Sequence, residues 1–165
     1  MIKSKSDLMG IIVPIVTPLT EDEELDEIGL KKQIARMIDS KVHGVFIGGS
    51  LGEYPNLMEK VKIDLYEQAC DLANGKLLKL ANISENSEKK VIENIAKIKN
   101  LAIDYYVVTA PFYFSYSQSD LKKFFTHIAD SSDKPLLIYN IPAFVNQNIS
   151  HELIFSLMDH PNIAG

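Results

Sequence analysis

The sequence lacks several features that mark whole classes of protein. It contains one cysteine, Cys70, in 165 residues, so an internal disulfide is excluded and a reducing cytoplasm is the expected compartment. No apolar run approaches the roughly 18 residues that a membrane span requires. Acidic residues outnumber basic ones by 22 to 17, giving a net charge of −5. Neither nucleic acid nor an anionic membrane is therefore expected as a partner.

Motifs for metals and nucleotides are also missing. The four histidines are scattered, without the HExxH spacing of a zinc site, so we expect no metal. They are His43, His127, His151 and His160. The first strand-like run leads into Thr17-Pro18 instead of a glycine-rich phosphate loop, and the glycines near Gly49 lack the lysine of a P-loop. We expect no cofactor.

The composition is that of a globular domain. Hydrophobic residues make up 46% of the chain and charged residues 24%, and this length is enough to bury a sizeable core. Apolar residues follow Lys3 and Lys5, as in a signal peptide, but Pro14, Thr17 and Pro18 interrupt them. We therefore expect a strand at this position and not a signal peptide.

Short apolar runs recur along the whole chain. They begin near Gly10, Gly44, Leu77, Tyr105 and Pro135, and a sixth begins at Asn162. The spacing is about 30 residues, the length of one strand-plus-helix unit. Leu136, Leu137 and Ile138 show no alternation, which is typical of a parallel strand covered on both faces.

The segments between these runs carry one-sided apolar stripes, as amphipathic helices do. Helices are expected to begin after Asp26, after Asn56 (whose spacing to Glu59 resembles a capping box), after Ser117 or Ser119, and after Ser150, which can act as a cap. Strands alternating with such helices predict an α/β fold with a parallel sheet. Because the phosphate loop is missing, a barrel is preferred to an open nucleotide-binding sheet.

Three hydroxyl side chains fall at the carboxyl ends of predicted strands: Ser50, Tyr113 and Tyr139. In a barrel these ends converge on one mouth, where hydroxyl groups can pass protons between a bound carbonyl compound and solvent. The turn glycines Gly49 and Gly52 let backbone N–H groups approach an anion closely.

Each of these residues also has a simpler interpretation. Tyr139 can be a rim residue with its hydroxyl in water, and Ser50 can serve only the turn between its glycines. Glu53 fits a helix-dipole or salt-bridge role better than that of a general base. Cys70 lies on the apolar side of its predicted helix, where packing is the expected role.

Four motifs, taken in order, resemble one enzyme family. They are Thr17-Pro18, the GSLGE turn at 49–53, APFY at 110–113 and YNIP at 139–142. The chain resembles, over nearly its whole length, the dihydrodipicolinate synthase and N-acetylneuraminate lyase family of pyruvate-dependent class I aldolases. The resemblance implies a (β/α)8 TIM barrel that commonly forms a homotetramer of tight dimers. Residues 1–165 would form one incomplete barrel domain, with about five β/α units and the start of strand six.

The resemblance also implies roles for the candidate residues. Family members form a Schiff base between pyruvate, or a related 2-keto acid, and a barrel lysine. Tyr139 would shuttle protons beside that Schiff base, and Ser50 would be the relay hydroxyl. Gly49, Ser50 and Leu51 would hold the pyruvate carboxylate, and Tyr113 would reach across the tight dimer interface.

Two residues depart from the family pattern. Leu51 stands where the family usually has a second hydroxyl residue. Phe144 stands where the synthase has an arginine for the carboxylate of its second substrate, so a bidentate anion clamp is missing. A 2-keto-3-deoxy sugar acid or a sialic-acid-like compound is therefore expected in preference to dihydrodipicolinate synthesis.

The family's lysine follows the motif Ile-Ala-Gly after one further residue, and this sequence ends at Gly165. Neither Lys76 nor Lys79 is an obvious replacement, so we expect this chain alone to be inactive. A partial barrel exposes unpaired strand edges, and we expect it to pair with another copy of itself. The alternative is a non-catalytic half-barrel that oligomerises and binds a small ligand or a partner.

Overall fold

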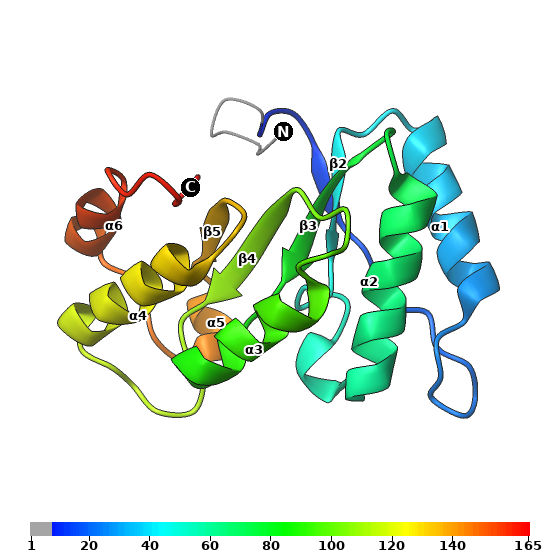
Figure 1. Cartoon of the computed structure of the whole chain (residues 1–165). Helices are drawn as coiled ribbons and strands as arrows, with labels where there is room; N and C mark the ends of the chain where they lie inside the picture. Colours follow the sequence, from blue (N-terminus) through cyan, green and yellow to red (C-terminus); the bar gives the residue numbers. More distant parts are fainter. Residues whose placement is uncertain (1–7) are drawn as a thin grey trace. The chain divides into compact units, whose positions relative to one another are not determined.

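The computed structural model describes residues 8–165, in which five strands alternate with helices (Figure 1). The chain forms two compact units. The N-terminal unit comprises Met9–Asn82 and Ile98–Asp104, and the C-terminal unit comprises Ile83–Lys97 and Tyr105–Gly165, together with Leu8. The expectation of one incomplete barrel domain stays a prediction. Lys3 and Lys5 lie outside the described residues.

Three parallel strands form the sheet of the N-terminal unit. They are β1 (Ile12–Pro14), β2 (Gly44–Ile47) and β3 (Leu78–Asn82). Gly44 lies opposite Ile12 on one side and Leu78 on the other. A Cβ at Gly44 would come within 2.8 Å of atoms of both residues, so the close pairing at this point requires glycine.

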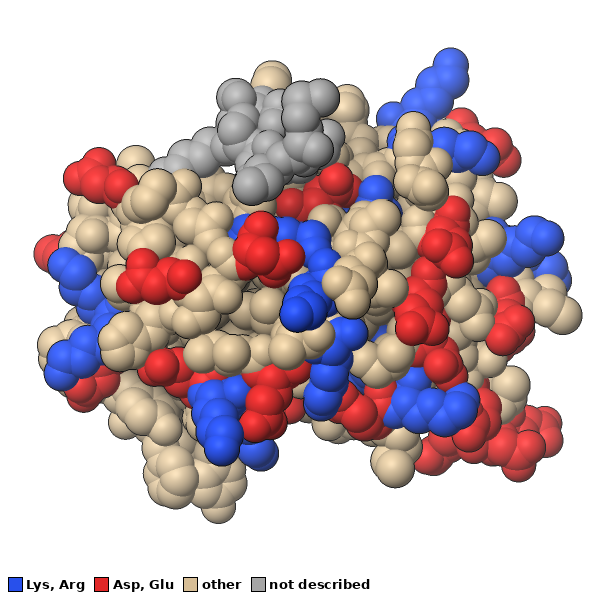
Figure 2. Space-filling view, viewed as in Figure 1, with Lys and Arg blue, Asp and Glu red and all other residues tan. Residues whose placement is uncertain are grey.

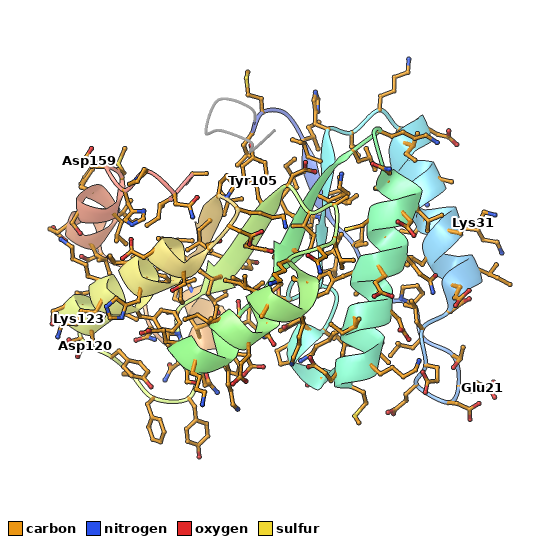
Figure 3. The ribbon with its side chains drawn as sticks, in the orientation of Figure 1. Glu21, Lys31, Tyr105, Asp120, Lys123 and Asp159 are labelled. Carbon is orange, nitrogen blue, oxygen red and sulfur yellow. The ribbon has the colours of Figure 1, made fainter. Side chains whose placement is uncertain are left out.

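Two helices pack against one another in the N-terminal unit: α1 (Glu27–Asp39) and α2 (Glu59–Ala73). They run side by side in Figure 1. The first helix begins after Asp26 as predicted, and Asp26 caps it, because its Oδ1 accepts a hydrogen bond from Gly29 N at 3.0 Å. Leu30 and Ile34 lie on the buried side of α1, whereas Lys31 points away from the ribbon (Figure 3).

The predicted cap of α2 is wrong. Asn56 ends a short 3-10 helix, η2 (Tyr54–Asn56), and its side chain donates to Glu53. α2 then begins at Glu59 after Met58, which makes no side-chain cap bond. The error arises because η2 occupies the residues between the β2 turn and α2, so Asn56 cannot reach the first amides of the helix.

Two further parallel strands, β4 (Tyr105–Thr109) and β5 (Leu136–Tyr139), belong to the C-terminal unit. Their register pairs Tyr106 with Leu136 and Thr109 with Tyr139. The last residues run beside β5, since Leu136 forms a parallel bridge with Ile163 and Ile138 N donates to Gly165 O at 2.9 Å. The predicted sixth run therefore lies along β5.

Four helices accompany these strands. They are α3 (Glu88–Ile98), α4 (Gln118–Ser131), α5 (Pro142–Val145) and α6 (His151–Leu157). Ser117, one of the two predicted alternatives, caps α4, and Ser150 caps α6 as predicted. The one-turn helix α5 was not predicted; Pro142 begins it and Asn146 ends it with a φ of 54°, a conformation that asparagine tolerates.

The expectation that β5 is covered on both faces is wrong. Leu137 and Ile138 are only half-buried. Ile138 lines an apolar cavity of about 360 Å³, together with Leu157 and Met158 of the α6 region and Ile163. Among the described residues, this side of the strand therefore faces the cavity.

No helix in residues 8–165 is long and apolar enough to cross a membrane.

Acidic side chains gather over the loop before α1 (Figure 2), where residues 21–24 are exposed and all carry carboxylates. Glu21 lies on this loop in Figure 3.

Candidate functional site

The turn that follows β2 is shaped by its glycines. Gly48 has a φ of 68°, and Gly52 N donates to Gly49 O at 3.0 Å, which closes the turn around Ser50. A Cβ at Gly49 would lie 2.6 Å from the ring of Phe46. Glycine is therefore needed for the ring to pack against the turn.

Two side chains tie the turn to neighbouring elements of its unit. Thr17 Oγ1, at the end of the first strand region, donates to Gly52 O at 2.7 Å. Asn82 Nδ2, at the end of β3, donates to Gly48 O at 2.8 Å. The carboxyl ends of the strands thus hold the turn on both sides.

Tyr66 of α2 forms a hydrogen bond with the backbone of Asn82. Its hydroxyl donates to the Asn82 carbonyl oxygen, and its side chain is fully buried. Burial raises the pKa of Tyr66 well above its ordinary value of 10, because the charged phenolate would be desolvated. Tyr66 therefore stays a neutral donor.

Ser50 is exposed on the turn, and Leu51 lines a cavity of about 240 Å³ beside it. Thr17, Glu23 and Glu53 also line this cavity, whereas Ser50 does not. Two carboxylates would repel a carboxylate ligand, so this cavity is unsuited to the predicted anion. Backbone N–H groups of the turn remain the candidates for anion binding.

Glu53 adopts a left-handed conformation with a φ of 52°. It precedes η2 without making a side-chain cap bond, and its Oε2 accepts from Asn56 Nδ2 at 3.3 Å. Its carboxylate thus stabilises the end of the turn by a local hydrogen bond.

Tyr139 is the last residue of β5 and is half-buried. Thr109 lies directly opposite it on β4, and Thr109 N donates to Ser84 Oγ at 2.9 Å. This places Tyr139 at the carboxyl end of the strand pair, as predicted from the sequence.

Tyr113 lies on the loop between β4 and α4, and its side chain is 83% exposed. Its ring meets the ring of Phe114 edge-on, with centroids 4.8 Å apart and an interplanar angle of 82°. Two bulky aromatic side chains are thus presented to solvent from one irregular loop.

Phe144 lies on α5, directly after β5, and is 70% exposed. The backbone of α5 fixes its position, because Phe144 N donates to Ile141 O at 3.0 Å. Phe144 therefore adds apolar surface on the segment that follows Tyr139.

Amide side chains hold the loops of the C-terminal unit, and sequence reasoning missed most of them. Asn86 Oδ1 accepts from Phe112 N at 2.7 Å, and Asn140 Nδ2 donates to Asn148 Oδ1 at 2.7 Å. Gln118 and Gln147 bond backbone groups about 30 residues away in the chain. Contacts of such sequence separation leave no local signal in the sequence.

Lys79 is engaged in a buried ion pair. Its Nζ lies 3.0 Å from Asp104 Oδ2, and its side chain is 7% exposed. Asp104 also accepts from Lys79 N at 2.9 Å. The ammonium group of Lys79 is therefore engaged in a structural contact inside the N-terminal unit. Lys76 is exposed in the turn before β3.

The described residues contain no group of three or more His, Cys, Asp or Glu side chains that could hold a metal. Cys70 forms no disulfide and is buried on α2, where it packs in the interior as expected.

The predicted site residues fall into two sets. Gly49, Ser50 and Leu51 share one turn of the N-terminal unit, whereas Tyr113, Tyr139 and Phe144 belong to the C-terminal unit. That the two sets meet at one barrel mouth stays a prediction.

Comparison with known proteins matches residues 7–165 to the dihydrodipicolinate synthetase family. The chain is 34% identical over 158 residues to 4-hydroxy-tetrahydrodipicolinate synthase of Methanosphaerula palustris, covering 94% of this chain and 54% of that protein. It is 33% identical over 159 residues to an uncharacterized DapA-like lyase of Thermococcus onnurineus, covering 96% and 54% of the two chains.

Among solved structures, the chain is similar to dihydrodipicolinate synthase of Acinetobacter baumannii complexed with pyruvate. The TM-score is 0.91 and the identity 27%, over 94% of this chain and 54% of that one. Such likeness, together with the five alternating strands, confirms the partial (β/α)8 barrel fold. The chain spans about half the length of the curated relatives it matches.

Proposed function

Because the chain belongs to the dihydrodipicolinate synthetase family, we propose that it supplies part of a Schiff-base lyase or aldolase that acts on pyruvate and an aldehyde. The observation that carries this proposal is the position of three hydroxyl side chains: Ser50 follows β2, Tyr113 follows β4 and Tyr139 ends β5. In a (β/α)8 barrel, catalytic groups come from the carboxyl ends of several strands.

The β2 turn is the proposed site for the pyruvate carboxylate. Gly49 lets the turn lie close against the Phe46 ring, and the bond from Gly52 N to Gly49 O closes the turn around Ser50 and Leu51, whose backbone N–H groups are the proposed donors. Backbone N–H groups fixed in such a turn bind anions without needing a charged residue. The keto group would then be held at a constant distance from the turn.

Tyr139, Ser50 and Tyr113 are proposed to pass the protons of the reaction. Schiff-base formation and carbon–carbon cleavage both require proton transfers at oxygen and carbon, and a positioned phenol can supply them. The 83% exposure of Tyr113 supports the proposal that it completes the relay in a second copy of the protein and not in its own.

Phe144 favours an aldehyde partner without a carboxylate at that position. An exposed aromatic ring offers apolar contact and no guanidinium clamp, so we propose a 2-keto-3-deoxy sugar acid or a sialic-acid-like substrate. The names of the relatives favour dihydrodipicolinate synthesis instead. Assays of both reactions in a form of the protein that carries a Schiff-base lysine separate the two: we expect cleavage of the sugar acid and no synthase activity.

Replacing Tyr139 by phenylalanine tests the proposed mechanism. In a lysine-bearing form of the protein, Tyr139→Phe should lower turnover by roughly 10²–10⁴-fold, the usual contribution of a positioned proton donor. An unchanged rate would remove Tyr139 from the mechanism. Tyr105→Phe, at a fully buried position at the start of β4, is the control for loss of a tyrosine hydroxyl elsewhere.

Residues 1–165 alone are proposed to be inactive, because they hold no lysine at the family's position. Treatment with pyruvate and borohydride should leave the mass of this chain unaltered. A covalent adduct on Lys76 or Lys79 would contradict the proposal. Reversible pyruvate binding without any adduct in a lysine-bearing form would point to a non-catalytic binding module.

We also propose that the chain associates with a second copy of itself in the cytoplasm. In the described sheet of the N-terminal unit, β1 pairs with β2 on one side only. The α6 region exposes Ile154, Phe155 and Met158, and Ile154 and Met158 also line the cavity beside β5. Unpaired strand edges and exposed apolar surface of this kind favour association with another chain.

A further inference from the structure

We infer that Gln147 is the positioning residue for Tyr113, an inference that rests on the proposed function of Tyr113. Its side-chain amide forms two hydrogen bonds with the loop between β4 and α4. Gln147 Oε1 accepts from Tyr116 N at 2.9 Å, and Gln147 Nε2 donates to Pro111 O at 2.7 Å. The two bonds fall on either side of Tyr113 along the loop.

The loop needs such support because residues 111–117 form neither helix nor strand. Each ordered backbone residue costs conformational entropy, and regular backbone bonding does not offset that cost here. Asn86 holds the start of the loop at Phe112 N. Gln147 holds it on both sides of the exposed Tyr113 ring, so the position of that ring depends on Gln147.

The chemistry of the two bonds selects glutamine at this position. Tyr116 N is a donor and Pro111 O is an acceptor, so the bridging group must accept one hydrogen bond and donate another. A neutral amide does both. A carboxylate of the same length accepts only, and would leave the carbonyl of the buried Pro111 without this donor.

The residues that follow Gln147 in the chain are themselves held by side-chain hydrogen bonds. Asn140, directly after β5, bonds both Asn148 Oδ1 at 2.7 Å and Ile149 N at 3.3 Å. Gln118, the first residue of α4, donates to Asn148 O at 3.0 Å and accepts from Ser150 N at 2.9 Å. These bonds fix the backbone on the carboxyl side of Gln147, so its side chain is aimed at the loop.

Amide hydrogen exchange, measured residue by residue by NMR on this 165-residue chain, tests the inference. Q147A should speed exchange of the Tyr116 amide by about tenfold, the effect of losing one ordinary hydrogen bond. The Ser150 amide, which Gln118 holds, should keep its protection. Q147E should restore most of the protection of Tyr116, because its carboxylate still accepts that bond.

The Tyr113 ring provides a second readout, which a merely structural role for Gln147 would not change. Because the Phe114 ring lies 4.8 Å from the Tyr113 ring between centroids, its ring current should shift the Tyr113 ring signals, and in Q147A these signals should move toward those of a free tyrosine. Q68A is the matched control, because Gln68 donates to Glu27 in the other unit. It should change neither readout.

Unchanged exchange at Tyr116 and unchanged Tyr113 signals in folded Q147A would overturn the inference. Should Q147A fail to fold, Q147M keeps the side-chain length without the hydrogen bonds and carries the same two predictions. Neither measurement requires pyruvate or a Schiff-base lysine. The role of Gln147 can therefore be confirmed even if Tyr139→Phe shows that the proposed reaction is wrong. A failure of the inference about Gln147 is thus distinguishable from a failure of the proposed function.

Discussion

At the scale of the residue, the support beneath the β2 turn depends on one buried phenol. Tyr66 donates to the carbonyl of Asn82, and the Asn82 side chain in turn donates to Gly48. This short chain connects the interior of α2 to the backbone that presents Ser50. Its integrity requires Tyr66 to remain neutral, which its raised pKa ensures.

Tyr66→Phe should make the protein less stable by about 1–3 kcal/mol at neutral pH, because the buried Asn82 carbonyl loses its donor. In the wild type, burial raises the Tyr66 pKa above its unfolded value of 10. The neutral Tyr66 hydroxyl therefore contributes its full share to the free energy of unfolding below about pH 10. This contribution is lost as the pH rises through the pKa of Tyr66 in the folded protein. The difference between the two proteins should therefore shrink above about pH 10, as measured by denaturant unfolding. A constant difference into the alkaline range would contradict this account.

The Lys79–Asp104 pair makes a second prediction at this scale. Lys79→Met should cost about 3–5 kcal/mol, because it leaves the mostly buried carboxylate of Asp104 without its countercharge. The double variant with Asp104→Asn should recover part of that loss. Lys60→Met is the control: Lys60 pairs with Glu24 and Asp64 at the surface, so the unfolding midpoint should hardly change. A tolerated Lys79→Met would show that the pair is not structural.

At the scale of the element, helix starts were predictable where the signal is local. Asp26, Ser117 and Ser150 each cap the helix that follows within three residues, so the sequence pattern contains the whole interaction. Asn56 was misassigned because η2 intervenes. The helix α5 was missed because four residues are too few to show a helical period.

Ser117→Ala should destabilise the protein by about 0.5–2 kcal/mol through loss of the α4 cap, measured by thermal or urea unfolding. Ser117 Oγ accepts from Asp120 N and also bonds the Asp120 carboxylate, which lowers the pKa of Asp120. Figure 3 shows Asp120 and Lys123 at the start of α4. Ser131→Ala is the matched control, since Ser131 is exposed at the other end of the same helix. Equal effects of the two changes would argue against the cap.

At the scale of the whole molecule, the repeat of strand and helix was visible in the sequence. Each strand-plus-helix segment buries apolar residues that recur with the period of its own secondary structure. The positions of Ser50, Tyr113 and Tyr139 at strand ends followed from that repeat. The amide network around Gln147 did not, because its bonds join residues about 30 apart. The half-burial of β5 was also missed, since an apolar run does not reveal whether both of its faces have neighbours.

Self-association should appear in sedimentation at micromolar concentration. Phe155→Glu should weaken it, because a charge would enter the exposed apolar surface of α6, where Phe155 is 68% exposed. Ile28→Glu on α1, at a side chain 67% exposed in the other unit, should leave it unchanged. A compact monomer in the wild type would rule out the proposed association.

The most direct test of the central claim is an NMR titration of this chain with pyruvate. We expect progressive shifts of the Ser50 and Leu51 amides, because the turn that Gly52 N closes onto Gly49 O is the proposed site of the carboxylate. Lactate, which carries the carboxylate without the keto group, should shift the same amides, and chloride should shift them less. Pyruvate that perturbs other amides while leaving residues 49–52 unaffected would contradict the claim that this turn binds the substrate carboxylate.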